Sequence, residues 1–223
     1  MSNGMKRSGR QEVEIKLRVK DATALKRRLG ELGAVNYGTV FECNTLYDTR
    51  PSRFRTAGCL LRLRIERRAS KRQTAGKARR SWHNNAVLTY KAPVKVIGGN
   101  AAKDSRYKIK EELETRIEDP GILEAILKAA GLHPGFRYEK YRTTYRLPTL
   151  PRLAIDLDET PIGTFLELEG SRKAIDQVAE ALGYTREGYS AASYWEVYRE
   201  SCRRRGVPVG NMVFKGTNRR EAP

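Results

Sequence analysis

Charged and apolar residues alternate strictly over positions 11–19 of the chain. The charged set is Glu12, Glu14, Lys16 and Arg18, and the apolar set is Val13, Ile15, Leu17 and Val19. Alternation with a period of two is typical of a β-strand that has one apolar and one polar face. The polar face here mixes acids and bases, which a strand that merely faces solvent does not require.

The same alternation recurs and predicts about eight strands. Further strand-like segments cover 61–66, 88–91, 106–116, 138–147, 154–158 and 167–169. Helical spacing and capping residues predict helices from Asp21 to Gly33, over 120–131, over 171–183 after Ser171, and over 190–205 after Ser190. The fold class is therefore α+β. If the strands close into a barrel, the charged faces line its lumen and the apolar faces pack against helices outside.

Length and composition are those of a single globular domain. The chain has 223 residues, of which 39% are hydrophobic and 31% charged, enough for one full core. No segment approaches the roughly 20 apolar residues that span a bilayer, and residues 1–10 lack the apolar part of a secretory signal. We expect a cytoplasmic protein. Three scattered cysteines, Cys43, Cys59 and Cys202, predict neither a disulfide frame nor a zinc site.

The net charge of +18 is concentrated in three segments. The N-terminus, residues 66–86 and the chain after Ser201 hold sixteen basic and two acidic residues, and so +14 of the total. We interpret residues 1–10 as a flexible basic N-terminus, 66–86 as a long flexible basic hairpin loop inserted in a domain over 11–205, and 206–223 as a flexible basic tail. Binding of nucleic acid or another polyanion by these segments, without catalysis, is an alternative hypothesis that we do not favour.

The mixed faces suit a substrate that carries several negative charges. A triphosphate needs converging cations, preferably arginines with their forked geometry. It also needs a divalent metal that bridges the phosphates. Magnesium and manganese prefer carboxylate oxygens. Alternate positions on neighbouring strands aim both kinds of group at one small volume.

The sequence resembles the CYTH, or triphosphate tunnel metalloenzyme, family, which includes class IV adenylate cyclases, thiamine triphosphatases and inorganic triphosphatases. The ordered matches are Glu12–Lys16, Asn44–Thr49, Leu61–Arg64, Leu88–Lys91, Lys110–Glu114, Lys140–Arg142, Leu157–Glu169 and Ser193–Tyr194. The chain departs from the family pattern at Ala92, where a glycine is common, and at Lys110, where an arginine is common. The resemblance implies a closed eight-stranded antiparallel barrel with helices packed outside.

The resemblance also implies the roles of the charged residues. The metal, Mg²⁺ or Mn²⁺, would be held by Glu12, Glu14, Glu167, Glu169 and an aspartate that is either Asp156 or Asp158. Phosphate oxygens would be bound by Lys16, Arg62, Arg64, Lys91, Lys110, Lys140 and Arg142. The catalytic set would be Glu12, Glu14, Lys16, Glu112 and Glu114, the last two interleaving with the cations.

Two reactions of the family compete for this chain. In hydrolysis, water attacks the terminal phosphorus with help from metal and a tunnel carboxylate. In cyclisation, the ribose 3′-hydroxyl of ATP attacks the α-phosphorus and pyrophosphate leaves. We favour hydrolysis of a nucleoside, thiamine or inorganic triphosphate, because it needs no adenine pocket and none is recognisable in the sequence. The predicted partner is thus a triphosphate small molecule, with no membrane, and the protein is a monomer or a homodimer.

Overall fold

The computed structural model describes residues 10–74, 77–94 and 106–216, with side chains over 11–68, 84–94 and 106–216. In these residues the strands are β1 (Arg10–Val19), β2 (Val35–Asp48), β3 (Leu60–Thr74), β4 (Lys77–Pro93), β5 (Lys108–Ile117), β6 (His133–Arg146), β7 (Ala154–Thr160) and β8 (Gly163–Glu169). The helices are α1 (Ala22–Glu31), α2 (Arg53–Thr56), α3 (Pro120–Ala129), α4 (Arg172–Ala181) and α5 (Tyr194–Arg205), with a 3₁₀ turn η1 (Arg186–Gly188).

The strands form a closed antiparallel barrel in the order β1-β5-β4-β3-β2-β6-β7-β8. Strand β1 closes it, because its first half pairs with β5 and its second half with β8. The predicted α+β class and eight-stranded antiparallel barrel are confirmed. Strand β2 is the one that the alternation did not single out.

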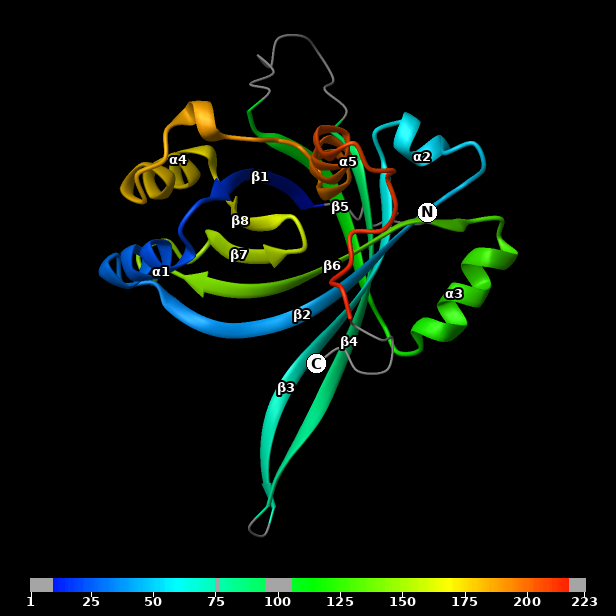
Figure 1. Cartoon of the computed structure of the whole chain (residues 1–223), viewed down its shortest axis with the longest axis horizontal. Coiled ribbons are helices and arrows are strands. Elements are labelled where there is room, and N and C mark those ends of the chain that lie inside the picture. The colour runs from blue at the N-terminus through cyan, green and yellow to red at the C-terminus, as the bar shows by residue number, and fades with distance from the viewer. Residues whose placement is uncertain (1–9, 75–76, 95–105, 217–223) are drawn as a thin grey trace, which may run out of the picture.

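The apolar faces of the strands point outward to helices. Ile15, Leu17, Ile155, Leu157, Leu166 and Leu168 are all 0% exposed and form one cluster with Leu25 and Leu29 of α1 and Ile175 and Val178 of α4. Helices α1 and α4 lie on one side of the barrel and α3 on the other (Figure 1). Each such buried side chain stabilises the fold by about 1.5–3 kcal/mol relative to exposure. The charged residues of the same strands therefore face inward.

The helices begin where a side chain caps them. Asp21, Asp119 and Ser171 each accept a hydrogen bond from the backbone N–H three residues on, as the sequence predicts. The last helix starts later than predicted. Ser193, not Ser190, is its N-cap, and with Glu196 it forms a capping box that satisfies two backbone N–H groups.

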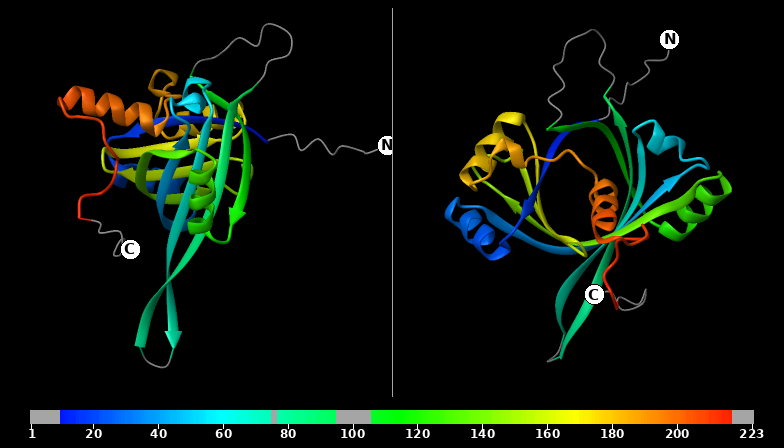
Figure 2. Two further views of the ribbon diagram at one scale, coloured as in Figure 1. Left: turned by 90° about the vertical axis from the view of Figure 1, so that its right-hand side faces the viewer. Right: turned by 45° about the horizontal axis from the view of Figure 1, so that its top comes forward.

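Residues 66–86 form a hairpin, as predicted, but most of it is paired strand and not loop. Strands β3 and β4 pair continuously from Leu60↔Lys91 to Thr74↔Lys77, and the ribbon extends well past the barrel (Figures 1 and 2). The composition did not reveal the strands, because a two-stranded ladder satisfies its own backbone hydrogen bonds without an apolar face. Residues 75–76 lie outside the described residues.

The tail is also more ordered than predicted, as far as it is described. Met212 is 0% exposed and its backbone pairs with β6 through Glu139 N–H and Arg137 C=O, both at 2.9 Å. The ring of Phe214 contacts Tyr141. One apolar residue in a polar segment is a weak sequence signal, so burial of Met212 was missed. The N-terminal and C-terminal predictions for 1–9 and 217–223 fall outside the described residues. No helix in the described part of the chain is both long and apolar enough to cross a membrane.

Candidate active site: a charged tunnel with two mouths

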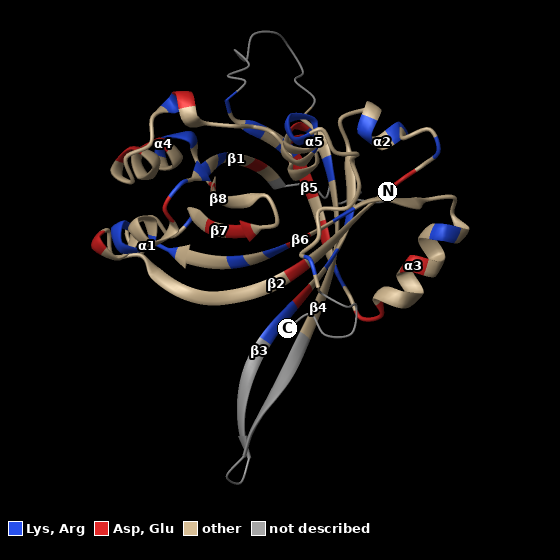
Figure 3. Cartoon of the chain, in the orientation of Figure 1, with Lys and Arg blue, Asp and Glu red and all other residues tan. Residues whose placement is uncertain are grey.

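Charged side chains from the barrel strands line a central cavity of about 280 Å³. Its described cations are Lys16, Arg62, Arg64, Lys91, Lys108, Lys140, Arg142 and Arg146, and its described acids are Glu12, Glu14, Glu112, Glu114, Asp156, Glu167 and Glu169. Acidic and basic positions are distributed along these strands (Figure 3). The predicted lumen with comparable numbers of acids and bases is thus present. We call this cavity the tunnel.

Three ion pairs join β1 to β4, β5 and β8 across the tunnel wall. Lys91 Nζ lies 2.5 Å from Glu12 Oε2, and Lys108 Nζ lies 2.7 Å from Glu14 Oε1. Lys16 Nζ lies 2.7 Å from Glu167 Oε1. In each of these three pairs the carboxylate faces an ammonium group, so these charges on the tunnel wall neutralise one another.

The two glutamates of β1 differ in acidity. Burial raises the pKa of Glu12 to about 7, and the nearby charge of Glu14 adds to this against the opposing Lys91. Burial acts on Glu14 in the same direction, but the ammonium groups of Lys108, Lys16 and Lys91 together outweigh it and hold the pKa of Glu14 below its usual range. Glu12 and Glu14 are thus not equivalent, although they are neighbours on one strand face.

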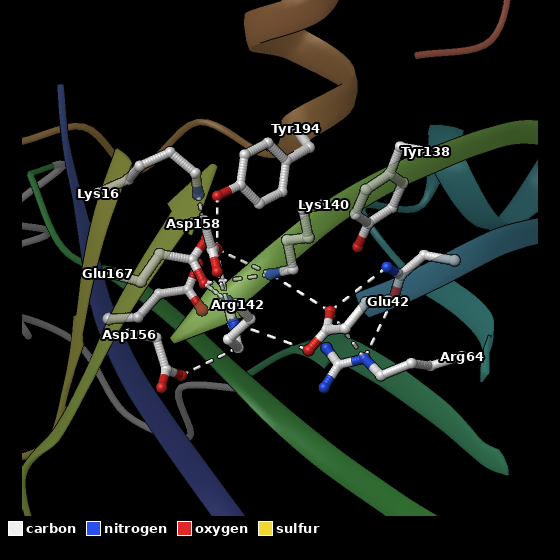
Figure 4. Close-up of polar contacts among 12 residues, drawn as sticks. Lys16, Glu42, Arg64, Tyr138, Lys140, Arg142, Asp156, Asp158, Glu167 and Tyr194 are labelled. Atoms are coloured by element: carbon white, nitrogen blue, oxygen red, sulfur yellow. Dashed lines mark hydrogen bonds and ion pairs between the residues drawn. The ribbon is translucent and has the colours of Figure 1, made fainter. Parts of the chain in front are cut away.

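Deeper in the tunnel, Arg142 is the centre of a dense ionic cluster (Figure 4). Its Nε and Nη2 donate to the two oxygens of Asp158, both at 2.7 Å, and its Nη1 lies 2.9 Å from Asp156 Oδ2. Arg142 also contacts Glu167. The fork of the guanidinium is therefore fully used by carboxylates from β7 and β8.

Asp158 and Asp156 occupy different places, which the sequence left open. Asp158 is 0% exposed and also accepts hydrogen bonds from Lys140 Nζ at 2.8 Å and Tyr194 Oη at 2.6 Å. Asp156 lines the tunnel and accepts a bond from Thr144 Oγ1 at 2.8 Å. Asp156 is thus the aspartate that a bound ion can reach, and Asp158 lies behind the cations as their anchor.

Glu42 of β2 belongs to this cluster and was missed from the sequence. It is 1% exposed and lies 3.4 Å from Lys140 Nζ, 3.4 Å from Arg64 Nε and 3.7 Å from Arg142 Nε. Burial opposes its ionisation, but Arg64, Lys140 and Arg142 outweigh burial and lower the pKa of Glu42. The sequence signal for Glu42 is its position two residues before Asn44. The residue was missed because apolar and polar residues alternate only weakly in this segment.

The predicted residues of β5 divide between the tunnel and its edge. Glu112 lies 3.1 Å from Lys91 Nζ, and Glu114 accepts a 2.7 Å bond from Thr89 Oγ1 and lies 3.7 Å from Arg62. Lys110 instead donates to the carbonyl of Gly58 at 2.8 Å and lines a neighbouring cavity. Lys108, to which the sequence analysis assigns no role, lines the tunnel instead.

The carboxylates fit a hard divalent ion by their chemistry. Glu14 and Glu169 are directly opposed on β1 and β8, and Asp156 and Glu167 are directly opposed on β7 and β8. All are oxygen donors, as Mg²⁺ and Mn²⁺ prefer. Within the described residues no three acids are grouped as a metal would require. Glu167, Glu14 and Asp156 are paired here with Lys16, Lys108 and Arg142 respectively.

A second cavity of about 500 Å³ adjoins the tunnel beside α2 and α5. It shares Leu46, Leu60, Lys91, Lys108, Ser193 and Trp195 with the tunnel, and we call it the first mouth. Phe54 and Phe136 also line it, and the guanidinium of Arg55 lies 5.5 Å from the Trp195 ring centroid. This aromatic-lined cavity was not recognisable in the sequence, because Phe54, Phe136 and Trp195 come from three segments far apart in the chain.

Comparison of the sequence with models of protein families matches residues 10–196 to the CYTH domain. The chain belongs to the CYTH family. A CYTH relative in Methanocaldococcus jannaschii, named "Putative adenylate cyclase MJ0240", is 26% identical over 83% of this chain and 97% of its own.

Two solved structures share the CYTH barrel. The PH1819 protein of Pyrococcus horikoshii has a TM-score of 0.66 at 22% identity and covers 85% of this chain and 99% of its own. HpAC1 of Hippeastrum, an adenylyl cyclase by name that is described as having a dominant triphosphatase activity, has a TM-score of 0.53 at 19% identity and covers 89% of this chain and 97% of its own. At these identities the likeness shows the fold.

Proposed function

We propose that this CYTH protein is a Mg²⁺- or Mn²⁺-dependent phosphohydrolase that removes the terminal phosphate of an organic triphosphate. The observation that carries the proposal is the closed tunnel of paired cations and carboxylates, continuous with a partly apolar mouth. The tunnel suits the phosphates and the first mouth suits the organic group.

The phosphates would be bound by exchange of ion-pair partners. The cations that form ion pairs with carboxylates in this structure would donate to phosphate oxygens in the complex; they are Lys16, Arg62, Arg64, Lys91, Lys140 and Arg142. Arginine forks suit phosphate as well as carboxylate. Glu112 and Glu114 would orient Lys91 and Arg62, with which they are paired. Because the cations are neutralised before binding, the empty tunnel avoids the cost of many uncompensated buried charges.

The carboxylates released by this exchange would hold the metal. Glu14, Glu167, Glu169 and Asp156 are the candidates that line the tunnel, and Glu12 lies next to them on β1. When bound, the metal supplies neutralisation of the charge that develops on the phosphates. Asp158 would keep Lys140, Arg142 and Tyr194 in place and would not bind the ion directly.

The first mouth supports an organic rather than an inorganic triphosphate. Trp195 and Phe54 offer ring faces and Arg55 a stacked cation, and Lys91 and Lys108 stand at the border with the tunnel. A flat heterocycle buried there would gain apolar contact while its phosphates reach the cations.

Cyclisation is the second candidate, and the first mouth is the observation that favours it. A pocket for a base removes the main argument against ATP as substrate, and the M. jannaschii relative is named as an adenylate cyclase. The HpAC1 structure keeps hydrolysis first, because that protein carries the cyclase name and is described with a dominant triphosphatase activity.

A substrate panel tests the proposal. ATP, thiamine triphosphate and inorganic triphosphate are supplied with Mg²⁺ or Mn²⁺, and phosphate, pyrophosphate and cyclic AMP are measured separately. We expect phosphate from an organic triphosphate, and its loss in Glu167→Gln and Glu169→Gln. The exposed Glu31→Gln on α1 is the matched control that keeps full activity. Turnover that survives both tunnel changes would remove the metal assignment, and cyclic AMP as the main product would replace hydrolysis by cyclisation.

A further inference from the structure

A third cavity of about 440 Å³ opens from the other end of the tunnel, at the base of the β3–β4 ribbon. It shares Arg64, Arg142, Arg146 and Asp156 with the tunnel. The rest of its lining is Arg68, the acids Glu42 and Glu66, the amides Asn84 and Asn85, and Val40 and Thr144. We call it the second mouth. It has no lining residue in common with the first mouth.

The two mouths lie at opposite ends of the same strands. Along β3, Leu60 lines the first mouth, Arg62 the tunnel and Arg68 the second mouth. At a rise of about 3.3 Å per residue, Leu60 and Arg68 are roughly 26 Å apart along the strand. Strand β6 repeats the order, with Phe136 at the first mouth and Arg146 at the second. The first mouth, the tunnel and the second mouth therefore follow one another along the barrel strands.

The chemistry of the second mouth differs from that of the tunnel. Arg68 and Arg146 donate to backbone carbonyls, of Tyr37 at 2.5 Å and of Tyr145 at 3.1 Å. Among the described residues neither has a carboxylate within ion-pair distance, whereas Arg142 beside them has four. The second mouth thus holds four arginines against the three acids Glu42, Glu66 and Asp156, and the guanidinium groups of Arg68 and Arg146, which are not held by carboxylates, suit a small oxyanion.

The sequence next to this cavity is basic. From Arg67 to Val94 it contains no acidic residue, so the net charge of this segment is positive, which favours anions at this end of the barrel.

We propose that the second mouth is the product port of the tunnel, where Arg68 and Arg146 bind the inorganic phosphate or pyrophosphate that the reaction releases. The inference rests on the proposed function, because it needs an organic triphosphate held with its organic group in the first mouth. The terminal phosphate then lies on the side of the second mouth. The organic product blocks the first mouth while it stays bound, so the inorganic anion leaves through the arginine-lined end. Both hydrolysis and cyclisation release an inorganic anion at this end.

Kinetics of Arg68→Gln and Arg146→Gln test the port, with Arg27→Gln on the exposed face of α1 as matched control. We expect the inhibition constant of added inorganic phosphate or pyrophosphate to rise roughly tenfold in each variant, the loss expected for one charge-assisted hydrogen bond to the anion, while the single-turnover rate stays at the parent value. Arg27→Gln should change neither quantity. An unchanged inhibition constant, or a tenfold fall in the single-turnover rate, would overturn the port and leave the proposed function standing.

A second measurement does not depend on turnover. The side-chain Nε–Hε NMR signals of the arginines are followed while inorganic phosphate, and then pyrophosphate, is added to the full chain. The signals that vanish in Arg68→Gln and Arg146→Gln identify the two residues. We expect both to shift in a saturable way while that of Arg27 stays constant. Absence of any shift overturns the port, even if every triphosphate is hydrolysed, and shifts in a protein without turnover would retain the anion site while the proposed function fails.

Discussion

The substitution Asp158→Asn separates an anchor from a metal ligand. In the structure Asp158 accepts two hydrogen bonds from Arg142 at 2.7 Å, one from Lys140 at 2.8 Å and one from Tyr194 at 2.6 Å, and it is 0% exposed. Asparagine keeps the shape and one acceptor oxygen but removes the charge. Two buried cations then lose a shared counter-ion.

The expected cost can be worked from these contacts. Removing one partner of a buried ion pair costs about 3–5 kcal/mol. Arg142 keeps Asp156, and Lys140 keeps Glu42 at 3.4 Å, so we expect the lower end, about 3 kcal/mol. For a chain of this size that corresponds to a fall in Tm of roughly 6–12 °C.

The assay is thermal and urea denaturation at neutral pH without metal, followed by titration with Mn²⁺. Asp156→Asn is the matched comparison, because Asp156 lies at the tunnel surface with Arg142 and Thr144 as partners. It should cost less than about 1 kcal/mol and should weaken Mn²⁺ binding more than Asp158→Asn does. If Asp158→Asn leaves stability unchanged and abolishes Mn²⁺ binding, Asp158 is the ligand and the anchor assignment is wrong.

Three further predictions concern the cluster, the mouth and the core. The pKa of Glu42 lies below its ordinary 4.5 in the fold, so ionised Glu42 stabilises the protein above about pH 4.5 and this contribution is lost as the pH falls further. Glu42→Gln should therefore be about 3 kcal/mol less stable than the parent at pH 7, with a difference in urea denaturation that shrinks below pH 4.5; a constant difference contradicts this. Trp195→Ala should lower kcat/KM for an organic triphosphate roughly tenfold and leave kcat/KM for inorganic triphosphate unchanged. Equal losses for both substrates would contradict the proposal that the first mouth binds the organic group. Leu166→Ala, at a 0% exposed position, should cost about 2–5 kcal/mol by urea denaturation, whereas a loss below 1 kcal/mol would contradict the outward-facing core.

The sequence predicts the site best where local and tertiary patterns agree. On β1, Glu12, Glu14 and Lys16 alternate with apolar residues that pack under α1 and α4, so a period of two reveals both faces at once. The order of such segments along the chain, matched to the family pattern, then suffices to predict the barrel. Asp156 and Asp158 share a strand face, however, and only the three-dimensional positions of Lys140 and Tyr194 tell the anchor from the residue at the tunnel surface.

Other features depend on contacts that local sequence does not encode. Glu42 sits on a strand with weak alternation, and its partners come from β3 and β6. The ribbon beyond Glu66 is held by hydrogen bonds between its own two strands. Its basic, apolar-poor composition suggested a loop, because such pairing needs no apolar face. Met212 is buried only because β6 offers an edge for backbone pairing. The first mouth requires Phe54, Phe136 and Trp195, which come from three separate segments.

Turnover in H₂¹⁸O tests the central claim most directly. The organic triphosphate that gives the highest rate in the panel is incubated with protein and Mg²⁺ or Mn²⁺, and the masses of the products are measured by mass spectrometry. Hydrolysis at the terminal phosphorus predicts one ¹⁸O atom in the released inorganic phosphate and none in the organic diphosphate. Unlabelled pyrophosphate with a cyclic nucleotide, or label in the organic product, would contradict it.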